Sequence, residues 1–209
     1  MQFIPKSVVE SAYNYTAYRQ LVDNLFDQNK TTGSDHSPAM LQYTKLNLSR
    51  MNRLDKKPRL TENRVHQVKN IGCPMIWLVI TEGWCGDAAQ IVPVLQHLVQ
   101  LNPLIELRFI LRDQHLAIMD AFLTNGGRSI PKVLVLDAST LQVLTTWGPR
   151  PEAAQELVMA YKAKGAATED IELKKRLSEQ SGKDLHLWYA KDKTVATQIE
   201  FLEVVARII

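Results

Sequence analysis

A continuous apolar run at residues 75–81, MIWLVIT, is the feature that most constrains how this chain folds. A run with no polar alternation is typical of a strand buried on both faces, as in a parallel or mixed sheet covered by helices. Cys85 and Asp87 follow at once, and from Ala88 onward apolar residues recur at helical spacing. The sequence therefore predicts a buried strand, a short turn that carries a cysteine, and a helix that begins directly after it.

The pattern downstream predicts a small α/β domain. Strand-like and helix-like segments follow in the order β-α-β-α-β-β-α, with the last two strands joined as a hairpin. This order predicts a three-layer sandwich, in which a four-stranded mixed sheet has helices on both faces. The expected strands lie at 105–111, 132–137 and 142–147, and the expected helices lie at about 114–123, with Asp113 as a cap, and from Pro151 to about Lys164, with Gly165 at its end.

Helical extensions are expected on either side of this domain. We divide the chain into an N-terminal extension (1–70), a central domain (71–165) and a C-terminal extension (166–209) that packs on the core, because an amphipathic helix must bury its apolar face. The expected helices of the extensions lie at about 7–28, 38–57, 61–70, from Thr168 to an end at Gly182, 184–190 and 193–207.

Composition excludes several classes of protein. The 209 residues carry a formal net charge of +3, which does not argue for a nucleic-acid or membrane partner. The N-terminus lacks the pattern of a signal peptide and no run reaches transmembrane length, so we expect a cytoplasmic protein. We expect no metal, because the five histidines are not at metal-ligand spacing, and no cofactor, because no glycine-rich phosphate loop occurs.

Cys85 is the candidate reactive group. A cysteine just before a helix lies at the positive end of the helix dipole, where free backbone N–H groups stabilise a thiolate. Asp87 acts in the opposite direction, since a nearby carboxylate disfavours a second negative charge. We expect a pKa for Cys85 that is lowered but not extreme. The alternative is a cysteine that is only a small buried hydrophobe.

Two short motifs resemble those of thioredoxins. Trp84-Cys85-Gly86 at a strand-to-helix junction matches the start of the thioredoxin motif, and Ile130-Pro131 precedes the hairpin where thioredoxins carry a cis-proline. The resemblance covers about residues 71–165. More closely, the chain resembles uncharacterised bacterial thioredoxin-family proteins with a Trp-Cys-Gly-Asp motif, helical extensions and a segment like Trp147–Pro151 after the hairpin.

The departures from thioredoxin are as informative as the match. Ala88 replaces the second cysteine, which resolves the mixed disulfide in a dithiol enzyme. Val79 and Phe109 stand where the resemblance implies a buried acid and its lysine partner. Cys73 is not expected to replace the second cysteine, because the intervening strand separates it from Cys85 by more than about 20 Å.

The resemblance also implies a binding surface. Ile130 and Pro131 would frame a shallow groove with Trp84, and the Ile130 backbone would pair with an extended peptide. Gly86 and Asp87 complete the candidate substrate-binding residues, and Arg128 is close enough in sequence to bring positive charge to the rim.

Three functions follow as alternatives. The favoured one is a monothiol redox protein, in which Cys85 exchanges with a disulfide-containing protein or a low-molecular-weight thiol and an external thiol resolves the product. The second is a non-catalytic module that binds a peptide or protein. The third is a glutathione-type transferase, which the extra helices allow and no residue requires. These inferences rest largely on the fold.

Overall fold

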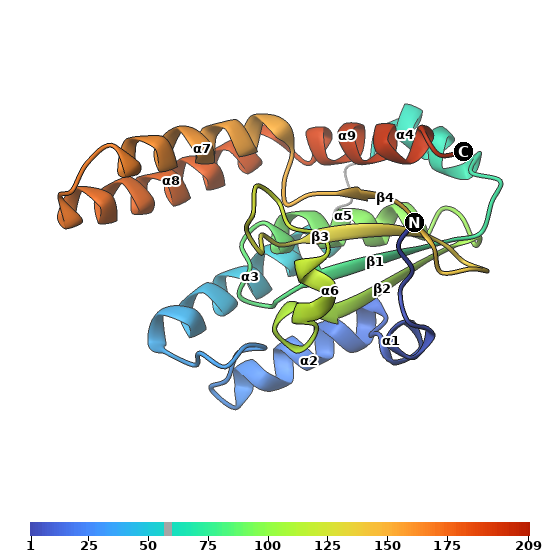
Figure 1. Ribbon diagram of the computed structural model, residues 1–209, viewed down its shortest axis with the longest axis horizontal. Coiled ribbons are helices and arrows are strands. Elements are labelled where there is room, and N and C mark those ends of the chain that lie inside the picture. The colour runs from blue at the N-terminus through green and yellow to red at the C-terminus, as the bar shows by residue number, and fades with distance from the viewer. Residues whose placement is uncertain (57–59) are drawn as a thin grey trace.

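The computed structural model describes residues 1–56 and 60–209, and at its centre is a four-stranded mixed sheet. The strand order is β2-β1-β3-β4, with β1 parallel to β2 and antiparallel to β3 (Figure 1). The predicted α/β sandwich is thus confirmed. The strands are β1 (Met75–Thr81), β2 (Ile105–Leu111), β3 (Lys132–Asp137) and β4 (Val143–Trp147).

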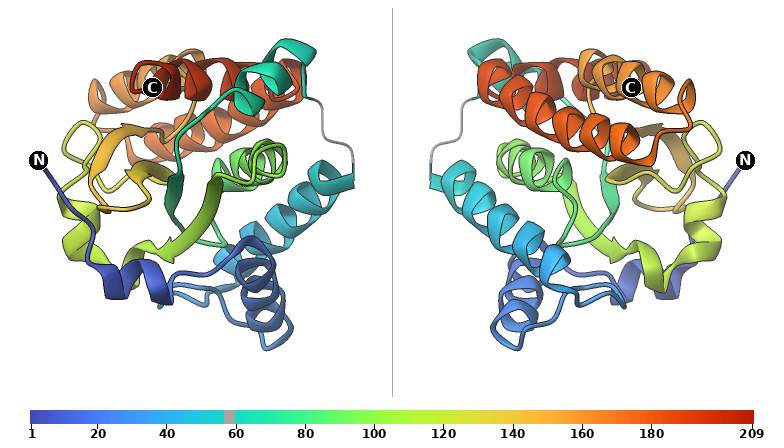
Figure 2. Two further views of the ribbon diagram at one scale, coloured as in Figure 1. Left: turned by 90° about the vertical axis from the view of Figure 1, so that its right-hand side faces the viewer. Right: turned by 90° about the vertical axis from the view of Figure 1, so that its left-hand side faces the viewer.

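Helices lie on both faces of this sheet, with α5 on one face and the short α6 on the other (Figures 1 and 2). The last long helix of the chain, α9, lies along the top of the sheet beside α4. The helices are α1 (Lys6–Ser11), α2 (Tyr15–Asp27), α3 (Pro38–Lys56), α4 (Glu62–Lys69), α5 (Ala88–Val99), α6 (Leu116–Asp120), α7 (Glu152–Ala166), α8 (Ile171–Asp192) and α9 (Val195–Ala206).

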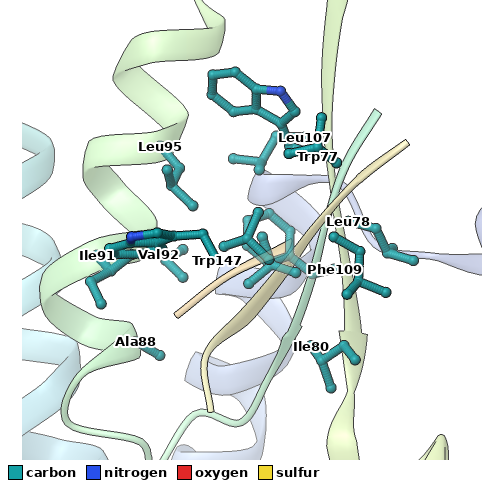
Figure 3. Packing of buried hydrophobic residues seen from close by; sticks show 14 of the residues in the cluster. Trp77, Leu78, Ile80, Ala88, Ile91, Val92, Leu95, Leu107, Phe109 and Trp147 are labelled. Atoms are coloured by element: carbon teal, nitrogen blue, oxygen red, sulfur yellow. The ribbon is translucent and has the colours of Figure 1, made fainter. Parts of the chain in front are cut away.

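The core forms between α5 and the sheet. Every residue of β1 is buried, as its continuous apolar run predicts. Ile91, Val92 and Leu95 of α5 point towards the strands (Figure 3). On the same sheet, the Trp77 ring meets the edge of Phe201 from α9, with 4.6 Å between ring centroids. The C-terminal helix therefore shares one core with the central domain.

The N-terminal extension covers both edges of the sheet. Tyr13 exchanges two backbone hydrogen bonds with Phe109 of β2, and Phe3 forms a bridge with Gln142 beside β4. Pairing of this kind removes free strand edges, which otherwise promote aggregation. It also explains why the single helix expected at 7–28 is wrong: the chain breaks between α1 and α2 to make the Tyr13 bridge, and Asn14 then caps α2.

Helix α7, at the end of the central domain, and α8, in the C-terminal extension, form a long helical hairpin that projects beyond the end of the sheet (Figure 1). The helix end predicted at Gly165 agrees with α7, which ends at Ala166, whereas the end predicted at Gly182 is wrong, because Gly182 lies inside α8. A Cβ added at either would meet no atom within 4 Å, so close packing requires glycine at neither position.

Two other boundaries differ from expectation. The helix predicted at 114–123 is a 3₁₀ turn (Arg112–Gln114) followed by the short α6, and Asp113 pairs with Arg112 instead of capping a helix. The helix end expected at about Lys57 lies outside the described residues. Within residues 1–56 and 60–209, no helix is long and apolar enough to cross a membrane.

Candidate functional site

The candidate site is a pocket of about 460 Å³ at the carboxyl end of β1. The turn that follows β1, the loop before β3, and helices α3 and α8 contribute its walls. Among the predicted site residues, Trp84, Cys85, Gly86, Asp87 and Ile130 line this pocket. Pro131 follows Ile130 through a cis peptide bond and does not line it.

Cys85 is a buried thiol at the wall of the pocket, with 7% of its surface exposed. Its Sγ donates a hydrogen bond to the Ile130 carbonyl (3.2 Å) and accepts one from the Ala88 N–H (3.5 Å). Burial, followed by the charge of Asp87, raises the pKa of Cys85 to about 12. The backbone N–H bonds and Arg150 favour the thiolate but do not outweigh these two effects. The expectation of a lowered pKa is therefore wrong.

Asp87 is held in a buried network. It receives two hydrogen bonds from Arg150, at 2.6 and 3.1 Å, and one from the Tyr189 hydroxyl at 2.7 Å. Burial acts to lower the pKa of Arg150, but the hydrogen bond and charge of Asp87 raise it above its ordinary value. Burial also raises the pKa of Tyr189 well above its ordinary range, so this hydroxyl stays a donor. Because Tyr189 belongs to α8, the network joins the C-terminal hairpin to the cysteine turn.

Four arginines line the pocket, and three of them have a carboxylate partner. The pairs are Arg112 with Asp113, Arg128 with Asp120, and Arg150 with Asp87.

Arg50 is the fourth, and it forms no ion pair with any residue that the structure describes. It donates instead to the Asn47 side-chain oxygen (2.9 Å) and lies 2.9 Å from Nε2 of His186. Burial and the nearby Arg50 lower the pKa of His186, which is therefore neutral at pH 7.

The uncompensated charge of Arg50 lies next to the cysteine turn. A Cβ placed on Gly86 would be 3.5 Å from Nη1 of Arg50 and 3.9 Å from the His186 ring. Asn47 strengthens this placement, since its amide also donates to the Gly83 carbonyl in the same turn (3.1 Å). One side of the pocket thus presents a fixed positive charge beside Cys85.

Trp84 forms another wall. The Arg112 guanidinium lies over its indole ring, 4.8 Å from the centroid, in a cation–π contact. Gly33 also approaches the indole closely, because a Cβ there would be 3.1 Å from Nε1 of Trp84. The N-terminal extension therefore helps to fix this side chain.

A buried acid lies near the site at a position that the resemblance does not indicate. Val79 and Phe109 are cross-strand partners and are fully buried, so the pair that the sequence comparison identified is apolar. Glu82 is a second buried carboxyl of this region besides Asp87, and it accepts hydrogen bonds from the Thr32 hydroxyl and the Asp113 N–H. Burial raises the pKa of Glu82.

Sequence reasoning did not identify Arg50, His186 and Tyr189 as site residues. These residues come from helices far apart in the chain, so no local pattern identifies them. The sequence does point to Arg150, because this residue lies inside the Trp147–Pro151 segment that carries part of the resemblance.

Cys73 and Cys85 are both free thiols. In the described part of the chain, no group of three or more His, Cys, Asp or Glu side chains is arranged to hold a metal ion.

Comparison with known proteins gives a family and a fold. A family model described as thioredoxin matches residues 33–165. No curated protein matches the sequence. A protein of unknown function, PA1234 from Pseudomonas aeruginosa, has a similar structure with a TM-score of 0.62 and 17% identity, over 97% of this chain and 96% of its own. An HIV epitope scaffold is similar with a TM-score of 0.57 and 16% identity, over 97% and 98% of the two chains.

The family model covers more than half of the chain and includes both the cysteine turn and the loop at Pro131. The mixed sheet and the placement of Cys85 before α5 agree with that match. The chain belongs to the thioredoxin family.

Proposed function

We propose that the chain is a thioredoxin-fold binding protein whose pocket at Cys85 takes a small anionic molecule. The observation that carries the proposal is Arg50, a half-buried cation beside Gly86 with no carboxylate partner in the described residues. A cation out of bulk water and without a counterion interacts strongly with an incoming carboxylate.

The other walls of the pocket agree with a small ligand. A volume of about 460 Å³ is in the range of small-molecule sites. Met40, Tyr43, Trp84 and Leu185 supply apolar contact area around the charge. The arginines that already have a carboxylate partner add little net charge, so the pocket suits a ligand with a carboxylate at one end and an apolar or thioether portion elsewhere.

The state of Cys85 also favours binding over turnover. A pKa of about 12 leaves the thiol protonated at pH 7, where only the thiolate is a nucleophile. A protonated thiol that donates to the Ile130 carbonyl acts as a polar wall of the pocket. No second cysteine is available to resolve a mixed disulfide, because Ala88 occupies that position.

Isothermal titration with S-methylglutathione tests this proposal, because this carboxylate-bearing thioether cannot exchange with a thiol. We expect saturable binding to the native chain and to Cys85→Ser, and a loss of at least about tenfold in affinity for Arg50→Gln, since a hydrogen-bonded charge contributes about 1.5–3 kcal/mol. Arg64→Gln is the matched control, because Arg64 contacts Gln67 on α4 away from the pocket. Equal affinity of Arg50→Gln and the native chain would overturn the proposal.

Monothiol exchange is the second candidate, and the Ala88 N–H that donates to Sγ favours it. In that reaction the Cys85 thiolate attacks one sulfur of a disulfide RS–SR, forms Cys85–S–SR and releases RS⁻. An external thiolate then attacks the mixed disulfide, takes up the R–S group as a new disulfide and releases the Cys85 thiolate. Mass spectrometry after incubation with oxidised glutathione distinguishes the candidates: a glutathionyl adduct confined to Cys85, and removed by added thiol, supports exchange.

A further inference from the structure

A second hollow, of about 350 Å³, lies on the other side of Tyr189 from Cys85. Tyr189 lines both spaces, and its hydroxyl donates to Asp87, so it forms the wall between them. The remaining walls come from the C-terminal part of α3, from α5 and from the junction of α8 with α9. None of the residues that bind Asp87 or surround Cys85, apart from Tyr189, takes part in this second hollow.

Positive charge gathers around the second hollow without a counterion. Arg53, Lys56 and Lys193 line it, and none of the three forms an ion pair with a described residue. None of its described lining residues is acidic. Asp192 precedes Lys193 in the chain, but its carboxylate accepts the Ala196 N–H at the start of α9 and does not line the hollow. Three cations around one space repel each other unless an anion joins them.

A buried amide side chain completes the hollow. Gln90 of α5 lines it, is only 7% exposed, and forms no side-chain hydrogen bond with the described residues. Although the residue is largely buried, its amide is not one of the described side-chain groups that are shut off from solvent without a partner, so it is open to the hollow and free to bind a ligand. Its N–H₂ group is a donor that a bound anion would satisfy, and it makes this hollow more than a cluster of surface lysines.

We propose that the hollow is a binding site for a small phosphate-bearing molecule, separate from the anion pocket at Cys85. A single carboxylate would leave two of the three cations uncompensated, whereas a phosphate group carries close to two negative charges and has several acceptor oxygens. Arg53, Lys56 and Lys193 supply the charge, and Gln90 donates from the α5 side. The volume suits one phosphate group and its attached fragment and not a polymer strand.

Isothermal titration with inorganic pyrophosphate tests this site at low and moderate salt. We expect saturable binding, a Kd raised about tenfold in Arg53→Gln and in Lys193→Gln, and a similar loss in Gln90→Met, which keeps the side-chain size and removes the amide. Lys191→Gln is the matched control: it removes one positive charge from the last turn of α8, next to Asp192, at an exposed position that does not line the hollow. Thermal unfolding of each variant verifies that it is folded.

The result that overturns the proposal is also specific. If Lys191→Gln weakens binding as much as Lys193→Gln, or if Gln90→Met has no effect, the anion is held by general surface charge.

Two parallel titrations identify the source of the phosphate. Binding of single-stranded oligonucleotide or of phosphatidylserine vesicles more tightly than pyrophosphate, with no effect of Gln90→Met, would assign the patch to a macromolecule or a membrane surface and contradict a small-molecule site. Unchanged binding of pyrophosphate in Arg50→Gln would show that this site is independent of the Cys85 pocket.

Discussion

At the scale of single residues, the Asp87 carboxylate organises the pocket. It joins Arg150, which follows the β-hairpin, to Tyr189 of α8, and its charge raises the pKa of the Cys85 thiol. Its local sequence, Trp-Cys-Gly-Asp, identifies Asp87 as a site residue but gives no sign of these two partners. Asp87 is therefore a positioning residue. It holds the segment after the β-hairpin against the pocket. Together with burial, its charge keeps the Cys85 thiol protonated.

Replacement of Asp87 by Asn should make Cys85 more reactive. The substitution removes the negative charge that disfavours a thiolate, while Arg150, which favours it, stays near. The pKa of Cys85 should fall, and iodoacetamide alkylation at pH 8, measured in a Cys73→Ser background, should accelerate by about tenfold for each unit. Asp184→Asn is the control, since Asp184 pairs with Tyr161 elsewhere in the hairpin. Equal alkylation rates for Asp87→Asn and its parent would contradict this role.

At the scale of elements, the turn at Gly148 requires glycine, whereas the α7–α8 hairpin does not require it at Gly165. Gly148 has a φ of +109°, and a Cβ there would lie 2.4 Å from the Pro131 carbonyl oxygen. Gly165, in contrast, lies in a helix with open space around it. The first glycine is required by a close backbone approach next to the candidate site, and the second is not required at all.

This contrast predicts opposite effects on stability. Gly148→Ala should lower the free energy of unfolding by about 2–4 kcal/mol, because a side chain there is strained and clashes with backbone. Gly165→Ala should raise it by about 0.5–1 kcal/mol, because alanine favours a helix. Urea denaturation measures both values. A Gly148→Ala protein as stable as the parent would mean that the turn does not approach Pro131 as described.

The elements that could be predicted from sequence are those with a local cause. The strands β1 to β4, and the start of α5 after Asp87, follow from apolar runs and alternation. The break between α1 and α2 could not be predicted, because Tyr13 leaves the helix to pair with Phe109, almost a hundred residues away in the chain. The helix end predicted at Gly182 was wrong for a related reason. Helix α8 continues through Gly182 because it packs along α7, and the sequence pattern does not show this contact.

At the scale of the whole molecule, the last three helices, α7, α8 and α9, form two distinct parts. The α7–α8 hairpin projects beyond the sheet and reaches the body through Tyr189 and His186 (Figures 1 and 2). α9 returns to the core, where Phe201 is fully buried against Trp77 and Trp147. Because α8 and α9 are contiguous, burial of Phe201 also fixes the wall that Tyr189 forms between the two pockets.

Phe201→Ala should therefore destabilise the whole chain and not only its last helix. Loss of a fully buried phenylalanine costs about 3–5 kcal/mol of unfolding free energy. Leu173→Ala, at a largely exposed position on α8, should change it by less than about 0.5 kcal/mol. Denaturation followed by circular dichroism and by tryptophan fluorescence should give one coincident transition. Separate transitions, or a native-like Phe201→Ala protein, would mean that α9 is an independent appendage.

The pocket itself forms only when parts of the chain that are far apart in sequence pack together. Trp84, Cys85, Gly86 and Asp87 were predictable because they are adjacent in sequence and lie at a strand-to-helix junction. Arg50 could not be found this way, since its significance depends on its forming no ion pair with any described residue of the folded chain. The direction of the Cys85 pKa shift could not be predicted either: the helix N-terminus is visible in the sequence, but the burial that outweighs it is a property of the assembled structure.

The pKa of Cys85 tests most directly whether this pocket binds its ligand or reacts with it. It is measured as the pH dependence of alkylation in a Cys73→Ser background, with Cys85→Ser as the blank. The alkylation rate should rise continuously through neutral and alkaline pH, without a plateau below about pH 10, because the thiol stays protonated with a pKa of about 12. A plateau reached below the free-thiol value of about 8.5 would contradict a protonated wall of a binding pocket and establish Cys85 as a working nucleophile.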